Sequence, residues 1–160
     1  MPTAFMSADS LPLRGIKVLE LSHMIMGPAA GLVLADLGAE VIKVEPIEGD
    51  RTRRLRGSGS GYFPVFNRNK QSLAVDLKSP EGQQIVRDLA LRSDMLVENF
   101  RDGGLDQYGL DYASLAEQNP GLIYVSLKGF LSGPYKNRTA LDEVVQMMGG
   151  LAYINGGDGT

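Results

Sequence analysis

The feature of this sequence that most constrains its fold is a repeated alternation of short apolar strands with helices. Gly15–Ser22 (GIKVLELS) is a mostly apolar run rich in β-forming residues, and Gly27-Pro28 interrupts it. Ala29–Leu37 is apolar apart from Asp36 and predicts a buried helix, and Ala39–Glu45 (AEVIKVE) predicts a second strand. A strand, a short turn, a helix and a strand form a βαβ unit, whose two strands are parallel.

The same alternation continues along the chain. Ser79-Pro80-Glu81 predicts a helix start, because Ser is a good N-cap, Pro suits the first helical position and an acid suits the first turn. Further strands are expected at Ser72–Leu77, Asp94–Phe100 and Leu122–Leu127, further helices at Tyr112–Glu117 and Asp142–Tyr153, and an irregular stretch at Ile47–Gly61. Five strands alternating with helices predict an α/β fold with a Rossmann-like, doubly wound parallel sheet.

A doubly wound sheet binds ligands outside the carboxyl ends of its strands. We therefore expect a binding site to be built from the segments that follow the strands. In this sequence they are residues 22–28, 45–56, 76–79, 98–104 and 128–138.

Composition narrows the classes of function. The 160 residues contain no cysteine, which excludes disulfides, thiolate metal sites and a cysteine nucleophile and suits a reducing cytoplasm. The net charge of −3 argues against a general nucleic-acid-binding protein. No apolar run approaches the roughly 20 residues that span a bilayer. We expect a mobile tail over residues 1–10, one domain over residues 11–160, and a cytoplasmic protein that binds neither nucleic acid nor membrane.

The turn after the first strand, residues 22–28 (SHMIMGP), offers backbone N–H groups at a helix N-terminus, where a phosphate or carboxylate can bind. It does not match G-x-G-x-x-G, so a nicotinamide-dependent enzyme is disfavoured. His23 is the only histidine, and a lone histidine is more often structural than catalytic. The chain has no G-x-S-x-G nucleophile elbow either.

Charged and aromatic side chains follow the other strands. Asp50–Arg56 (DRTRRLR) holds four arginines, which form either a cationic rim for ligand phosphates or a solvated loop. Asn99-Phe100-Arg101 can hydrogen-bond to and stack on an adenine or pantetheine group. Lys78 is either a point charge for a phosphate or an ordinary surface lysine. Asp142-Glu143 opens the last helix, where acids usually complement the helix dipole; the alternative is a carboxylate facing an acyl group.

Several blocks, read in order, resemble a known family. The blocks are LRGIKVLELSHMIMGP, LADLGAEVIKVEP, GDRTRR, FNRNKQSLAVDLKSPEG, LVENFRDGGLDQYGL, NPGLIYVSLKGF and LDEVVQMMGGL. Together they extend from Leu11 to Gly150 and resemble the class III CoA-transferases, among them formyl-CoA transferase and carnitine CoA-transferase.

The resemblance implies transfer of coenzyme A (CoA) from an acyl-CoA donor to a carboxylic acid. A carboxylate nucleophile would form an acyl–enzyme anhydride and then an enzyme–CoA thioester, with no metal and no prosthetic group. It also implies that this chain is the CoA-binding amino-terminal portion, that a second domain completes the subunit, and that two subunits form an interlocked homodimer.

The resemblance places CoA contacts at three strand ends. They are His23, Met24, Ile25 and Met26; Val75, Asp76, Leu77 and Lys78; and Asn99, Phe100 and Arg101. Two basic residues of formyl-CoA transferase are replaced here by Pro46 and Gln107, and the Arg51–Arg56 cluster can substitute for the first.

The family's nucleophilic aspartate is expected beyond Thr160, so the 160 residues alone are expected to be inactive. Asp142 aligns with an acid that lines the active site. Leu141 stands where the related α-methylacyl-CoA racemases carry a histidine, which disfavours racemase chemistry. Arg138 either pairs with a second carboxylate of the acid substrate or faces solvent.

A non-catalytic CoA-binding fragment remains the alternative function. A fragment would expose apolar side chains of the last helix, so we expect the isolated chain to be poorly soluble or to oligomerise. These side chains are Val144, Val145, Met147, Met148 and Leu151.

Overall fold

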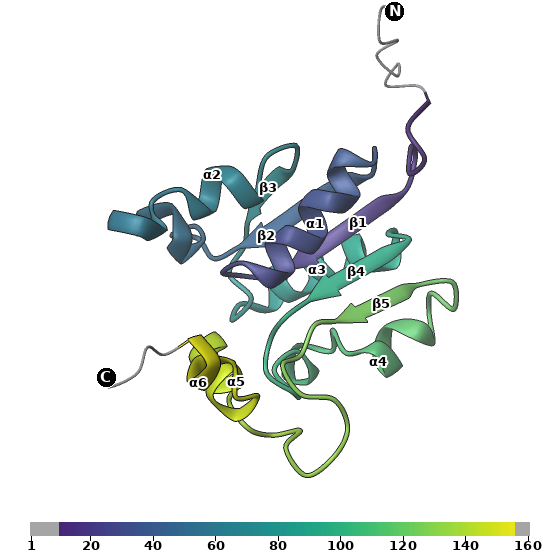
Figure 1. The fold of residues 1–160 in the computed structure, drawn as a ribbon. Helices are drawn as coiled ribbons and strands as arrows, with labels where there is room; N and C mark the ends of the chain where they lie inside the picture. Colours follow the sequence, from purple (N-terminus) through teal and green to yellow (C-terminus); the bar gives the residue numbers. More distant parts are fainter. Residues whose placement is uncertain (1–9, 156–160) are drawn as a thin grey trace, which may run out of the picture. The chain divides into compact units, whose positions relative to one another are not determined.

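The computed structural model describes residues 10–155, and the chain divides into two compact units between Leu127 and Lys128. The first unit contains a five-stranded sheet in the order β3-β2-β1-β4-β5, with every neighbouring pair parallel (Figure 1). The strands are β1 (Lys17–Leu21), β2 (Glu40–Glu45), β3 (Gln71–Ala74), β4 (Met95–Glu98) and β5 (Ile123–Ser126). The five predicted strands and the parallel sheet are thus confirmed.

Helices cover both faces of this sheet. They are α1 (Met26–Asp36), α2 (Tyr62–Phe66), α3 (Pro80–Leu91) and α4 (Tyr112–Ala116). On one face, Ala35 of α1 packs with Val18, Val41 and Val97. On the other face, residues of α3 and α4 pack with Leu19 of β1 and Leu96 of β4. These two side chains point away from the face to which their neighbours along the strands, Val18 and Val97, point. Two separate apolar clusters on one sheet confirm that the fold is doubly wound.

The predicted start of α3 is also confirmed. The Ser79 side chain accepts a hydrogen bond from the Gly82 amide at 3.0 Å, and Pro80 is the first helical residue. By contrast, α1 begins at Met26, earlier than the predicted Ala29. Pro28 therefore lies inside the first turn, which is tolerated because N–H groups there have no intrahelical partner.

The stretch predicted to be irregular contains short helices. These are the 3₁₀ helices η2 (Arg51–Arg54) and η3 (Gly57–Gly59), and α2 follows them. Another 3₁₀ helix, η4 (Asp106–Tyr108), lies later in the chain and precedes α4. The ring of Phe63 in α2 lies 3.7 Å from the Arg53 guanidinium carbon. A contact between residues ten positions apart in different elements stabilises this region, and local sequence pattern does not reveal such a contact.

The second unit contains two helices where one was predicted. α5 (Asp142–Met148) is followed by its C-cap residue Gly149 and then by α6 (Leu151–Asn155). Gly150 has φ +76°, which is outside the helical region, so the prediction of a continuous Asp142–Tyr153 helix is wrong. The five apolar side chains of this region named above are exposed. Over residues 10–155, none of the helices has the length and apolarity needed to cross a bilayer.

We expect Leu96→Ala to lower the free energy of unfolding by about 2–5 kcal/mol, because it opens a cavity between the sheet and α3. Leu96 is fully buried, whereas Ile85 on α3 is 48% exposed. Ile85→Ala is therefore the control and should change stability by about 0.5 kcal/mol or less. Urea unfolding followed by circular dichroism measures both, and equal losses would contradict the assignment of the core.

Candidate functional site

The turn after β1 and the segment after β4 are joined at the edge of the sheet where the strands end. The His23 amide donates to Asn99 Oδ1 at 3.0 Å, and Asn99 Nδ2 donates to the His23 carbonyl at 2.8 Å. The His23 ring lies edge-on to Phe100, with 5.7 Å between centroids. Because β1 and β4 are neighbours whose chains continue to opposite sides of the sheet, this junction is the topological switch point, where such folds bind ligands.

The turn itself presents apolar side chains to solvent. Met24, Ile25 and Met26 are all exposed. Met24 has φ +64°, a left-handed conformation that costs a non-glycine residue about 1 kcal/mol or more. The two hydrogen bonds from Asn99 hold the adjoining His23 backbone, so the turn keeps this conformation.

The segment after β3 extends the same edge. The Val75 amide donates to the Glu45 carbonyl at 2.8 Å, and the Val75 side chain is buried in the core. Asp76 Oδ1 accepts from the Lys78 amide at 2.9 Å. Leu77 packs partly against the core, while the Asp76 and Lys78 side chains are exposed. Lys78 is thus an accessible cation, and Val75 can offer a ligand only its backbone.

The remaining predicted positions differ in their surroundings. Arg101 is exposed beyond β4, and Gln107 donates from Nε2 to the Gly104 carbonyl at 3.1 Å within its own loop. Asp142 belongs to the second unit, where its Oδ2 accepts from Gln146 at 2.7 Å. Arg138 is in the same unit, with its guanidinium 4.9 Å from the Tyr135 ring centroid.

The arginine cluster divides into two kinds. Arg53 forms a bidentate pair with Glu45, through Nε at 2.7 Å and Nη2 at 2.6 Å, while Arg54 donates to the Glu48 carbonyl at 2.5 Å. These two arginines stabilise the fold of the segment. All four arginines are exposed, but the contacts above hold only Arg53 and Arg54 to the segment, so Arg51 and Arg56 are the members of the cluster best placed to meet a ligand.

Three buried glutamates near the strand ends were not predicted from the sequence. Glu20 accepts from Ser22 Oγ at 2.6 Å, Glu45 from the Asp50 amide at 2.7 Å, and Glu98 from the Phe100 amide at 2.7 Å. Each carboxylate therefore holds the loop that follows its own strand. The signal was present as an acid within or at the end of each apolar strand (LEL, KVE, LVE), where a buried acid needs a compensating partner.

A buried lysine connects two of these loops. Lys43 Nζ lies 3.2 Å from Glu20 Oε1 and 3.1 Å from Asp50 Oδ2, and it donates to the Ser22 carbonyl at 2.7 Å. The Lys43 side chain is 1% exposed and that of Glu20 is fully buried. One ammonium group thus contacts the turn after β1 and the segment after β2.

A second buried lysine pairs with the same glutamate. Lys70 Nζ lies 2.6 Å from Glu20 Oε2 and donates to the Pro28 carbonyl at 2.7 Å. Gly31 of α1 lies directly over this pair, since a Cβ atom there would come within 1.9 Å of Glu20 Oε2. The close approach of the helix to the ion pair therefore requires glycine at this position.

The protonation states follow from these contacts. Burial opposes ionisation of Glu45, but hydrogen bonds from Arg53, the Asp50 amide and Ser72 lower its pKa to about 2. Burial lowers the pKa of His23, nearby Asp50 raises it, and Lys43 and Arg51 lower it, with a net decrease. The His23 ring is therefore mainly neutral at neutral pH and acts as a hydrogen-bonding or stacking group, not as a cation.

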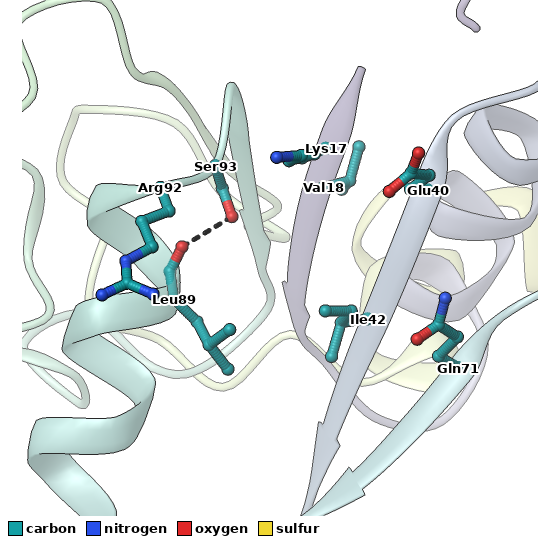
Figure 2. A pocket seen from close by; sticks show the side chains of 8 residues that line it. All are labelled: Lys17, Val18, Glu40, Ile42, Gln71, Leu89, Arg92 and Ser93. Atoms are coloured by element: carbon teal, nitrogen blue, oxygen red, sulfur yellow. Dashed lines mark hydrogen bonds between the residues drawn. The ribbon is translucent and has the colours of Figure 1, made fainter. Parts of the chain in front are cut away.

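A hollow of about 220 Å³ lies at the opposite edge of the sheet (Figure 2). It is lined by the first residues of β1, β2 and β3 and by the end of α3, where Ser93 Oγ donates to the Leu89 carbonyl at 2.8 Å. Ligands of parallel α/β sheets bind at the carboxyl edge, so we assign the site to the loops and not to this hollow. Among the described residues, no group of three or more His, Asp or Glu side chains is placed to hold a metal ion.

Comparison with known proteins gives consistent similarity over nearly the whole chain. The sequence profile of CoA-transferase family III matches residues 13–160. A succinate–glutarate CoA-transferase of Agrobacterium fabrum is 45% identical over 157 residues, covering 91% of this chain and 39% of the relative. A formyl-CoA:oxalate CoA-transferase of Streptomyces coelicolor is 43% identical over 148 residues, covering 90% of this chain and 36% of the relative.

The fold matches at the same level. A crystal structure of a CAIB/BAIF family protein from Brucella suis superimposes with a TM-score of 0.85 and 45% identity, over 93% of this chain and 42% of that one. The chain therefore spans about two fifths of the length of the proteins that it resembles.

We expect Gly31→Ala to destabilise the protein by about 1–3 kcal/mol, because the added methyl group would displace the buried Glu20–Lys70 pair. Alanine is otherwise favoured over glycine within a helix, so a loss of stability in Gly31→Ala would have to come from the clash with the ion pair. Gly61→Ala is the matched control, since no heavy atom lies within 4 Å of its added Cβ. Thermal unfolding measures both, and a stabilised Gly31→Ala variant would refute the close approach.

The Glu45–Arg53 pair should contribute to acid resistance. The pKa of Glu45 is lowered from 4.5 to about 2, so its stabilisation is complete above pH 4.5 and is lost as pH falls toward 2. Glu45→Gln should have a lower free energy of unfolding than the parent at neutral pH. Between pH 4.5 and about pH 2, however, it should lose less of that free energy than the parent does. The exposed Glu48→Gln is the control, and unfolding free energies across this range test whether the two profiles differ.

Proposed function

Since the chain belongs to CoA-transferase family III, we propose that it supplies the CoA-binding part of an enzyme that moves CoA from an acyl-CoA thioester to a free carboxylic acid. The observation that carries this proposal is the junction of His23 and Asn99 at the switch point, with exposed cations at the neighbouring strand ends. Relatives with about 45% identity are CoA-transferases by name.

The three chemical parts of CoA each have a suitable counterpart at this edge. Lys78, Arg101 and Arg51 are exposed cations that can meet its phosphates. The Phe100 ring offers a face for the adenine. The exposed methionine and isoleucine side chains of the turn after β1 suit the pantetheine arm, which is long and partly apolar.

The proposed reaction uses covalent catalysis by a carboxylate. The carboxylate attacks the thioester carbonyl, an anhydride to the enzyme forms, and the CoA thiolate leaves. The thiolate then attacks the enzyme's own carbonyl carbon in the anhydride, releasing the donor acid and leaving an enzyme–CoA thioester. The acceptor acid repeats these steps in reverse and departs as the new acyl-CoA.

We assign no nucleophile within residues 10–155. Asp142 is proposed as an acid that lines the acyl site. The names of two relatives pair CoA with succinate, glutarate or oxalate, so we propose a small dicarboxylic acid as substrate, with Arg138 as a candidate partner for its second carboxylate. The interlocked homodimer stays a prediction from the family resemblance, and the cytoplasmic location stays a prediction from the absence of cysteine.

We expect Lys78→Ala and Arg101→Ala each to weaken CoA binding by about tenfold, the effect of losing one charge-assisted contact. Lys17 is the matched control, because it is an exposed lysine on the first residue of β1, at the opposite edge of the sheet. Lys17→Ala should bind CoA like the parent. Isothermal titration with CoA measures all three.

Two results would contradict the proposal. A well-folded parent chain that does not bind CoA would refute the site as a whole. If Lys17→Ala weakened CoA binding as much as Lys78→Ala and Arg101→Ala do, general electrostatic attraction, and not a defined site, would account for the binding.

A further inference from the structure

The buried Lys43 side chain links two loops that are separate in sequence. Its ammonium group donates to the carbonyl of Ser22, the residue before His23, and pairs with Asp50, the residue before Arg51. Asp50 in turn caps η2 by accepting from the Thr52 amide at 2.8 Å. The orientation of the turn after β1 and that of η2 are therefore set by contacts to one buried cation.

We propose that Lys43 is a positioning residue of the CoA site, which holds the His23 turn and the Arg51 segment in a fixed relation so that one ligand meets both. This inference rests on the proposed function. Lys43 does not itself touch the ligand in this arrangement, because its side chain is 1% exposed.

The charges around Lys43 explain why it can serve this purpose. Buried cations are costly unless they are paired and hydrogen-bonded. Lys43 has two carboxylate partners, Glu20 and Asp50, and one carbonyl partner, so its three N–H groups are used within the fold. Glu20 is shared with Lys70, so two ammonium groups and two carboxylates lie together in one buried network.

Lys70 provides the matched comparison. It is nearly as buried, with a side chain 2% exposed, and it pairs with the same Glu20. Its further contacts, however, are the Pro28 carbonyl and Asn67 Oδ1, and not the residues that adjoin His23 and Arg51. A loss of stability is expected from either lysine, whereas a change in loop position is expected from Lys43 alone.

The single histidine reports on the charges beside the turn after β1. His23 is the only histidine in the chain, so its ring gives one set of proton NMR signals in protein prepared without a histidine tag. Burial lowers the pKa of this ring, nearby Asp50 raises it, and Lys43 and Arg51 lower it, so the titration midpoint responds to charges in both loops.

The experiment compares Lys43→Met, Asp50→Asn and Lys70→Met with the parent by CoA titration, His23 NMR titration and thermal unfolding. Lys43→Met should raise the titration midpoint of His23 and weaken CoA binding at least tenfold. Asp50→Asn should weaken CoA binding also but lower the midpoint, because the carboxylate that raises the pKa is gone. Lys70→Met should melt at a lower temperature with the midpoint unchanged and CoA affinity within twofold of the parent.

The outcomes separate the two proposals. If the parent does not bind CoA, the proposed function fails, and the positioning role, which rests on it, fails with it. If the parent binds CoA and Lys43→Met binds it equally well, the inference is wrong. If Lys43→Met does not fold, Asp50→Asn decides, since it removes the charge that Lys43 pairs with and retains an oxygen for Thr52; unchanged CoA affinity in that variant overturns the inference.

Discussion

The pairing of β1 with β2 on one side and with β4 on the other is the interaction on which the rest of this structure depends. Both faces and both edges of β1 are covered, so its side chains past Lys17 are all buried. The register of the two pairings decides which residues meet where the strands end. It brings Ser22 close to the segment after β2 and His23 to Asn99, although 76 positions separate the last two in sequence.

The acidic side chains buried in these strands are less expected than the apolar side chains beside them. A buried carboxylate contributes little net stability even when it is paired, but it has few acceptable arrangements. Glu20, Glu45 and Glu98 each accept a hydrogen bond from the loop that follows their own strand, and other elements supply further partners, such as Lys43 and Lys70 for Glu20. The strands thus determine the shape of the loops through side chains that point into the protein, and the exposed residues of the same loops remain available for a ligand.

Much of the fold can be predicted from the sequence, for identifiable reasons. The run GIKVLELS, its partner AEVIKVE and the Ser79-Pro80-Glu81 cap are local signals, and each predicts an element that the structure contains. The helix α2 and the 3₁₀ helix at Arg51–Arg54 could not be predicted in this way, because they depend on Arg53 lying between Glu45 and Phe63. The residues of the candidate site could be predicted as strand-end segments, but the contacts that hold them could not, since those depend on register.

The division of the arginine cluster has a consequence for the response of the protein to ionic strength. Charges within a buried network are shielded from dissolved ions, whereas exposed charges are screened over about 8–10 Å at physiological salt. Lys43 and Lys70 are buried and paired, and Arg53 is partly exposed but forms a bidentate pair with the buried Glu45. Arg51, Lys78 and Arg101 face water. Salt should therefore weaken the attraction of a polyanion to the loops while it leaves the loops in place, so that ionic strength changes this attraction without altering the fold.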